Sequence, residues 1–276
     1  MCEDTPDDLV FEQMTRQMFT GALGRSVLGT KENLTKMTSE DLFVYLDSHY
    51  TAENLLISVS GSFTDTHKSL ICETFSAAKK GTKNQIDMPE YSKTTVETTK
   101  EIEQNHICLA FPAFEYSAPE RYAFQVFNGI LGAGMSSRLF QRIREQLGLC
   151  YSVYSFPTTH TDIGSLGIYT ATNAATEEKV VANIISELEK FKNDGITADE
   201  LEKSREQIKS GFLLSLENTQ TRMSYNAKSE LFFGRVISDD DLANEYDKIT
   251  TDDVLQIAAA VLNLEKMSFS AVRGKK

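Results

Sequence analysis

The sequence predicts an α+β fold in which a mainly antiparallel sheet is covered by helices. Strand-like alternation and helical periodicity are mixed along the chain without a strict βαβ order, which is the pattern of the α+β class. The chain has 276 residues, of which 41% are hydrophobic and 25% are charged, so it has the composition of a globular protein. A segment near the N-terminus also recurs near the C-terminus, which indicates a duplicated architecture.

The N-terminal part is expected to be mostly helical. Thr5 and Pro6 are typical of a helix start, and Val10, Met14 and Met18 follow at helical spacing. The further elements expected here are an irregular segment at 21–37, a helix from Thr38 to about 50, a strand at 57–60, a helix at 65–80 and a linker at 81–92.

The remainder of the chain alternates strands and helices. A helix after Pro119 is expected to bury Phe124, Phe127 and Leu131. The expected strands are 93–99, 105–112, 150–156, 165–172 and 266–272, and the other expected helices are 137–147, 176–193, 197–216, 220–233, 239–247 and 251–262.

The repeat joins residues 36–42 to residues 248–254 at an offset of 212. Each copy opens a capped helix that leads into an alternating strand and a glycine, although such capped helices also recur by chance. A tandem duplication makes 93–276 a complete second half-domain and 1–80 the C-terminal portion of a first half-domain, with 81–92 as the linker. We therefore expect the first copy to be truncated by about 110–120 residues.

Composition excludes several classes of partner. The formal net charge of -12 argues against nucleic-acid binding and against anionic membranes. No stretch approaches the roughly 18 apolar residues of a membrane span. Cys2, Cys72, Cys108 and Cys150 are scattered and form no CxxC pair, which predicts reduced thiols and a cytoplasmic protein.

No complete catalytic or metal centre is predicted. His49, His67, His106 and His160 are far apart and lie in no HxxEH or HExxH pattern, so we expect structural roles for them. The 132–137 segment is a glycine turn rather than a nucleotide loop, because it follows a helix and lacks the third glycine. The acidic run 239–241 fits a first helical turn.

One constellation is a candidate binding site. A basic helix is expected to end at Gly148, so that Arg144 on its last turn and Tyr151 on the next strand could face one cavity. A guanidinium and a phenol in that position could bind a polarised peptide carbonyl. The alternative is a structural role, because cationic residues are common near helix C-termini.

The segment 132–155 resembles the second half of insulinase/pitrilysin-type zinc metallopeptidases. It reads GxGMSSRLFQxIRExxGLxYSVYS in that family's pattern, and it is most similar to the bacterial processing proteases related to mitochondrial processing peptidase. Residues 23–30 and 50–54 resemble the end of the family's first half, and 217–223 and 231–234 resemble its C-terminal helices.

The resemblance implies two homologous α+β halves, with the zinc motif HxxEH in the first half. That motif is absent here, so zinc is implied for the full-length family and no metal ligand is assigned to this chain. The family's substrate-binding arginine and tyrosine match Arg144 and Tyr151, and Arg142 is the weaker candidate for the arginine.

The implied function is the C-terminal part of a zinc-dependent metalloendopeptidase, which supplies chamber wall and contacts to a peptide or protein substrate. This chain alone is expected to be inactive and to associate with itself or with a zinc-bearing half. The alternatives are a non-catalytic partner or scaffold subunit of the same family and a stand-alone peptide-binding domain.

Overall fold

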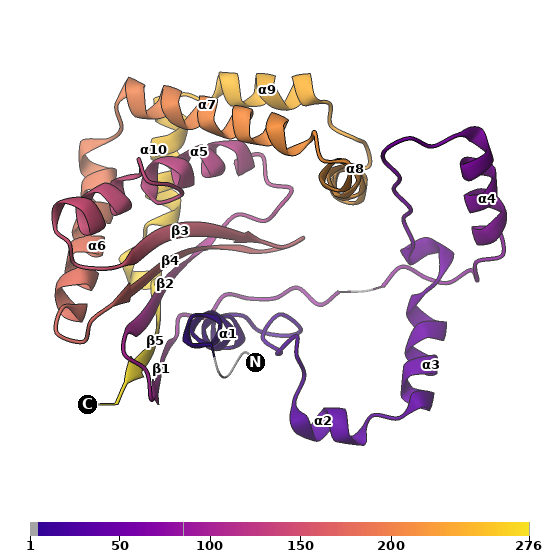
Figure 1. The fold of residues 1–276 in the computed structure, drawn as a ribbon, viewed down its shortest axis with the longest axis horizontal. Helices are drawn as coiled ribbons and strands as arrows, with labels where there is room; N and C mark the ends of the chain where they lie inside the picture. The colour runs from indigo at the N-terminus through magenta and orange to yellow at the C-terminus, as the bar shows by residue number, and fades with distance from the viewer. Residues whose placement is uncertain (1–4, 85, 276) are drawn as a thin grey trace. The chain divides into compact units, whose positions relative to one another are not determined.

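The computed structural model describes residues 5–84 and 86–275. Its contacts divide the chain into two compact units. The sheet unit comprises Met1–Arg25, Met88–Ser210 and Asp240–Lys276, and the helical unit comprises Ser26–Asp87 and Gly211–Asp239. The expected α+β class is confirmed by a mixed sheet with helices packed against it (Figure 1).

A five-stranded sheet organises the sheet unit, in the order β1-β5-β2-β4-β3. Only the β1–β5 pairing is parallel, so the expected antiparallel character holds for the other three pairings in the described sheet. The last strand of the chain thus lies between the first two. The strands are β1 (Thr95–Lys100), β2 (Asn105–Ala113), β3 (Ser152–Thr159), β4 (Gly164–Thr172) and β5 (Ser268–Gly274).

Several helices cover one face of this sheet (Figure 1). Phe127 of the helix after Pro119 is fully buried, and its ring centroid lies 5.0 Å from that of Phe191, in the edge-on geometry that aromatic pairs favour. These helices are α5 (Arg121–Leu131), α6 (Glu177–Asp194), α7 (Ala198–Ser215), α9 (Asp239–Lys248) and α10 (Thr251–Val261).

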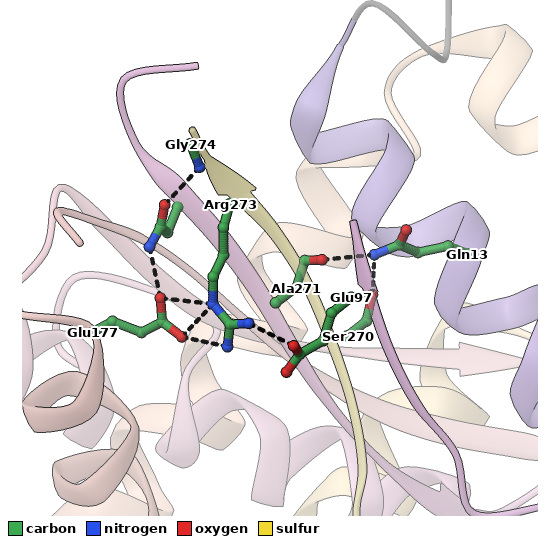
Figure 2. Close-up of polar contacts among 8 residues, drawn as sticks. Gln13, Glu97, Glu177, Ser270, Ala271, Arg273 and Gly274 are labelled. Atoms are coloured by element: carbon green, nitrogen blue, oxygen red, sulfur yellow. Dashed lines mark hydrogen bonds and ion pairs between the residues drawn. The ribbon is translucent and has the colours of Figure 1, made fainter. Parts of the chain in front are cut away.

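Helix α1 (Pro6–Met18) packs on the opposite face, where Val10, Met14 and Met18 are buried as their spacing predicts (Figure 1). Gln13 adds a buried polar anchor. Its Nε2 donates to the Ser270 Oγ at 2.8 Å and to the Ala271 carbonyl at 3.1 Å (Figure 2). Removal of such a buried partner is costly, so α1 is held in one register on the sheet.

The arginine of β5 ties the sheet to the start of α6 (Figure 2). Arg273 lies 2.7 Å from Glu97 of β1 and 2.7 Å from Glu177 of α6. Glu177 also accepts a 2.6 Å hydrogen bond from Asn105. These carboxylates raise the pKa of Arg273 through hydrogen bonds, chiefly that of Glu177, and the network fixes the corner between β4 and α6.

The edge strand β3 is covered where α5 ends. The Ser155 amide donates to the Gly132 carbonyl at 3.1 Å, and a Cβ built on Gly132 would lie 2.5 Å from that amide nitrogen. Close approach of two backbones therefore requires glycine here, and the 132–137 segment is a turn as expected. Pro157 lies in the same edge strand, a position that tolerates the missing N–H.

The helical unit differs from the sequence expectation in three places. The 57–60 segment is extended but pairs with no described strand, and α4 ends at Phe75 rather than near 80. A short helix capped by Thr30 lies within the segment expected to be irregular. The unit's helices are α2 (Lys31–Lys36), α3 (Ser39–His49), α4 (Asp65–Phe75) and α8 (Thr219–Phe233).

The repeat is visible as two matched capping boxes. Thr38 and Asp41 cap α3, and Thr250 and Asp253 cap α10 with the same reciprocal hydrogen bonds. A short 3-10 turn follows each helix, at 52–54 and at 264–266. The same local structure therefore recurs at the offset of 212 that the sequence displays.

A tertiary hydrogen bond also recurs in the two units. In the sheet unit the Ser270 hydroxyl donates to the Val10 carbonyl at 2.9 Å, and in the helical unit the Ser58 hydroxyl donates to the Met223 carbonyl at 2.8 Å. Each bond joins a helix to the extended segment after a capped helix. We infer that each unit combines parts of both repeats. The expected linker at 81–92 between the two half-domains stays a prediction.

Candidate functional site

The candidate site is built on a π-helical turn, Phe140–Gln146, where an ordinary α-helix was expected. The Leu147 amide donates to the Arg142 carbonyl at 3.2 Å, which is the wider i to i−5 pattern. Gly148 has a φ of 60° and its amide donates to the Arg144 carbonyl at 3.1 Å. The expected glycine stop is therefore confirmed, because the left-handed conformation that reverses the chain suits glycine.

The two arginines of this turn have different surroundings. Arg142 lies 3.7 Å from the buried carboxylate of Glu187, and its Nη1 donates to Gln146 at 3.0 Å. Arg144 is exposed, and its guanidinium carbon lies 4.8 Å from the centroid of the Phe140 ring. Arg142 is therefore held by an ion pair, whereas Arg144 stacks on Phe140 and interacts electrostatically with the Cys150 thiol.

Tyr151 lies immediately before β3, on the far side of the Gly148 turn from Arg144. Its side chain is 71% exposed, which leaves the phenol accessible. No hydrogen bond joins the Arg144 and Tyr151 side chains among the described residues. Cys150 is half-buried beside them, and burial raises the pKa of its thiol, which favours the unreactive protonated form.

Aromatic side chains form the adjacent face of the sheet. Tyr154 of β3 is 38% exposed, and its ring centroid lies 5.1 Å from that of Tyr169. Phe156 packs on Tyr154 at 5.8 Å. Burial raises the pKa of Tyr169, and its hydroxyl lies 2.8 Å from His106 Nδ1. This cluster was not predicted from the sequence, although Tyr154 and Phe156 alternate as residues on a common face of a strand do.

The four histidines are dispersed. His49 stacks on Tyr45 with 4.2 Å between ring centroids, and His67 accepts from the Thr64 amide at the start of α4. His160 lies 6.1 Å from the Phe19 ring, and burial lowers the pKa of His106. The structural role expected for each histidine stays a prediction.

The thiols and the acidic run also have structural surroundings. Cys72, Cys108 and Cys150 are free thiols, and Cys2 lies outside the described residues. Asp239 of the acidic run begins α9 and pairs with Arg222 at 3.1 Å.

The described residues do not fit a zinc site. Within 5–84 and 86–275, no group of three or more His, Cys, Asp or Glu side chains could hold a metal ion. A catalytic zinc needs about three protein ligands and an open position. The chemistry that the described site supports is hydrogen bonding by Arg144 and Tyr151.

A known protein family matches more than half of this chain. The family description "Peptidase M16 inactive domain" matches residues 36–208. The chain belongs to the peptidase M16 family. The matched range includes the π-helical turn, Gly148 and Tyr151, and membership confirms the resemblance to zinc metallopeptidases.

Bacterial proteins named as zinc proteases are similar along almost the whole chain. The uncharacterized zinc protease YmxG of Bacillus subtilis is 37% identical over 94% of this chain and 64% of its own length. An uncharacterized zinc protease of Streptomyces coelicolor is 32% identical over 95% of this chain and 60% of its own length. The M16 chain thus spans less than two thirds of these curated relatives.

Solved structures share the fold. A peptidase M16 inactive domain from Pseudomonas fluorescens has a TM-score of 0.90 at 20% identity, covering 99% of this chain and 67% of that one. A chain of complex III2 from Candida albicans has a TM-score of 0.88 at 20% identity, over 99% and 67% of the two chains. Each helix of the described residues is too short or too polar to span a bilayer.

Proposed function

We propose that this chain is the substrate-binding, C-terminal part of a zinc-dependent metalloendopeptidase that acts on peptides or proteins. The observation that carries the proposal is the exposure of Arg144 and Tyr151 on either side of the left-handed Gly148 turn. The names of the curated relatives support the reaction class.

The chemistry of the pair suits a peptide backbone. The guanidinium of Arg144 presents several N–H donors in one plane, so it can hold a peptide carbonyl with more than one hydrogen bond. The phenol of Tyr151 adds a single donor from the adjacent strand. Donors fixed near a carbonyl bind it more strongly as negative charge develops on its oxygen, so the pair would favour cleavage as well as binding.

The zinc-bearing half is proposed to pair with this chain. The curated relatives are longer than the segment matched here, which leaves room for such a half. This chain would then supply chamber wall and substrate contacts. None of its described residues is proposed as a zinc ligand.

Peptide binding by this chain tests the proposal. A fluorescein-labelled, unstructured 20-residue peptide without net charge is titrated with the chain, and binding is followed by fluorescence anisotropy. Arg144→Ala and Tyr151→Phe are each expected to weaken binding by about fivefold to tenfold, which is the effect of one lost hydrogen bond.

Matched controls exclude a general surface effect. Tyr50 has a side chain that is 68% exposed, close to the exposure of Tyr151, and Arg16 is exposed on α1. Tyr50→Phe and Arg16→Ala are expected to leave the affinity unchanged. Equal affinities for all four variants would contradict the proposed site and favour a non-catalytic scaffold subunit.

A further inference from the structure

The turn between Arg144 and Tyr151 is held by its own backbone on the side of the helix. The Gly148 amide donates to the Arg144 carbonyl and the Leu149 amide donates to the Ile143 carbonyl, both at 3.1 Å. The Tyr151 amide then donates to the Ala171 carbonyl of β4 at 3.2 Å. The helix therefore fixes the beginning of the turn and β4 fixes its end.

The carbonyl of Leu149, at the centre of the turn, is bound by side chains. The Thr172 hydroxyl donates to it at 2.9 Å, and the Thr176 hydroxyl lies 3.4 Å from it. The two hydroxyls are 2.8 Å apart. Because each hydroxyl has one hydrogen, Thr176 can donate to Thr172 while Thr172 donates to Leu149, and such a chain strengthens both bonds.

These threonines lie at a rigid corner of the sheet unit. Thr172 is the last residue of β4 and is 1% exposed, and Thr176 is the N-cap residue of α6. The next residue, Glu177, is held by Arg273 at 2.7 Å (Figure 2). The hydroxyl pair therefore connects the turn to an element that cannot move independently of the sheet.

We propose that Thr172 is a positioning residue for the Arg144–Tyr151 pair, and that Thr176 supports it. This inference rests on the proposed function. Arg144 and Tyr151 are exposed, so packing does not fix them and their spacing depends on the backbone that joins them. Catalytic and binding groups lose much of their effect when they move by about 1 Å. The hydrogen bonds of Thr172 and Thr176 at the Leu149 carbonyl, here called the Thr172 clamp, therefore determine how well Arg144 and Tyr151 can bind the same peptide carbonyl.

The test compares valine and serine at position 172 in the full chain. Thr172→Val keeps the size of the side chain and removes the donor, and is expected to weaken binding of the labelled neutral peptide about fivefold to tenfold. It is also expected to speed the amide hydrogen exchange of Gly148, Leu149 and Tyr151. Thr172→Ser restores the donor and is expected to restore both properties.

Thr170 provides a matched control on the same strand. It is fully buried, and at the turn its hydroxyl interacts with the Cys150 thiol and not with the Leu149 carbonyl. Thr170→Val is expected to change neither peptide affinity nor exchange at the turn. Equal weakening by Thr170→Val and Thr172→Val would overturn the positioning role.

Further outcomes separate this inference from the proposed function. If Arg144→Ala and Tyr151→Phe weaken binding but Thr172→Val does not, the positioning role is overturned and the proposed site stands. If neither Arg144→Ala nor Tyr151→Phe weakens binding, the proposed function fails whatever Thr172 does. Should Thr172→Val fail to fold, Thr176→Val tests the same clamp, with a smaller expected loss of affinity in the same direction.

Discussion

Arg142 and Arg144 are two positions apart and have different surroundings, so the exposed arginine of the candidate site is set residue by residue. The seven-residue spacing and the glycine stop are local features, so the sequence could predict them. The pairing of Arg142 with Glu187 depends on how α6 packs against the turn, and no local pattern contains it. The Thr172 clamp was missed for the same reason, since it joins segments that meet only in the folded sheet.

The role of Tyr151 can be tested in a complete enzyme that joins this chain to a zinc-bearing half. Tyr151→Phe removes one hydrogen-bond donor and little else, because the side chain is 71% exposed. Turnover is expected to fall by a factor on the order of 100, since a preorganised donor at a developing oxyanion contributes about 3 kcal/mol. Steady-state kinetics and zinc analysis check this. Unchanged turnover per folded molecule would make the tyrosine structural.

Glu200 gives a pH-dependent prediction. Its carboxylate is held by Arg138 at 2.6 Å, and this hydrogen bond is the largest cause that lowers the pKa of Glu200 to about 2. A lowered pKa stabilises the folded protein above the unfolded value near 4.5, and this stability is lost as pH falls towards 2. Glu200→Gln is therefore expected to lower the free energy of unfolding by about 1 to 3 kcal/mol at pH 7.

Urea unfolding of both proteins at pH 7 and at pH 3 measures that difference. The difference in the free energy of unfolding between wild type and Glu200→Gln should be smaller at pH 3 than at pH 7. A gap that stays constant with pH would show that the ion pair is not its source.

At the scale of elements, the same local sequence produces a packed helix in one place and an exposed helix in the other. Helices α3 and α10 share the Thr–Asp capping box, which the sequence predicts because capping is local. Val254 and Ile257 of α10 are buried, whereas no described residue of α3 is buried. The expected strand at 57–60 is wrong for the same reason, because a strand requires partners that local sequence does not supply.

This contrast predicts unequal costs for truncating matched positions. Val254 is fully buried and its repeat partner Leu42 is 53% exposed. Val254→Ala is expected to lower the free energy of unfolding by about 2 kcal/mol, because it leaves a cavity. Leu42→Ala removes more atoms and is expected to cost less than about 0.5 kcal/mol. Equilibrium urea unfolding measures both. A larger loss for Leu42→Ala would contradict the exposed placement of α3.

At the scale of the whole molecule, the metal content of the chain can be predicted. We expect no stoichiometric zinc and no peptide hydrolysis by the chain alone, since its sequence contains no HxxEH motif and a catalytic zinc needs about three protein ligands. Metal analysis after dialysis and a fluorogenic peptide assay test this. One bound zinc per chain that is lost when His49, His67, His106 or His160 is replaced would overturn the prediction.

The exposed apolar side chains of the helical unit predict self-association. Phe43 is 70% exposed and Tyr45 is 55% exposed on α3, and Leu55, Ile57 and Val59 are each more than 40% exposed on the extended segment. Apolar surface of this extent is usually covered, and the charge of -12 opposes association only weakly at physiological salt. We therefore expect the mean mass from light scattering to rise with concentration. Phe43→Glu should reduce this rise, whereas Met135→Glu, which replaces a 75% exposed residue of the sheet unit, should not. Monodisperse monomers of the unmodified chain at high concentration would contradict the prediction.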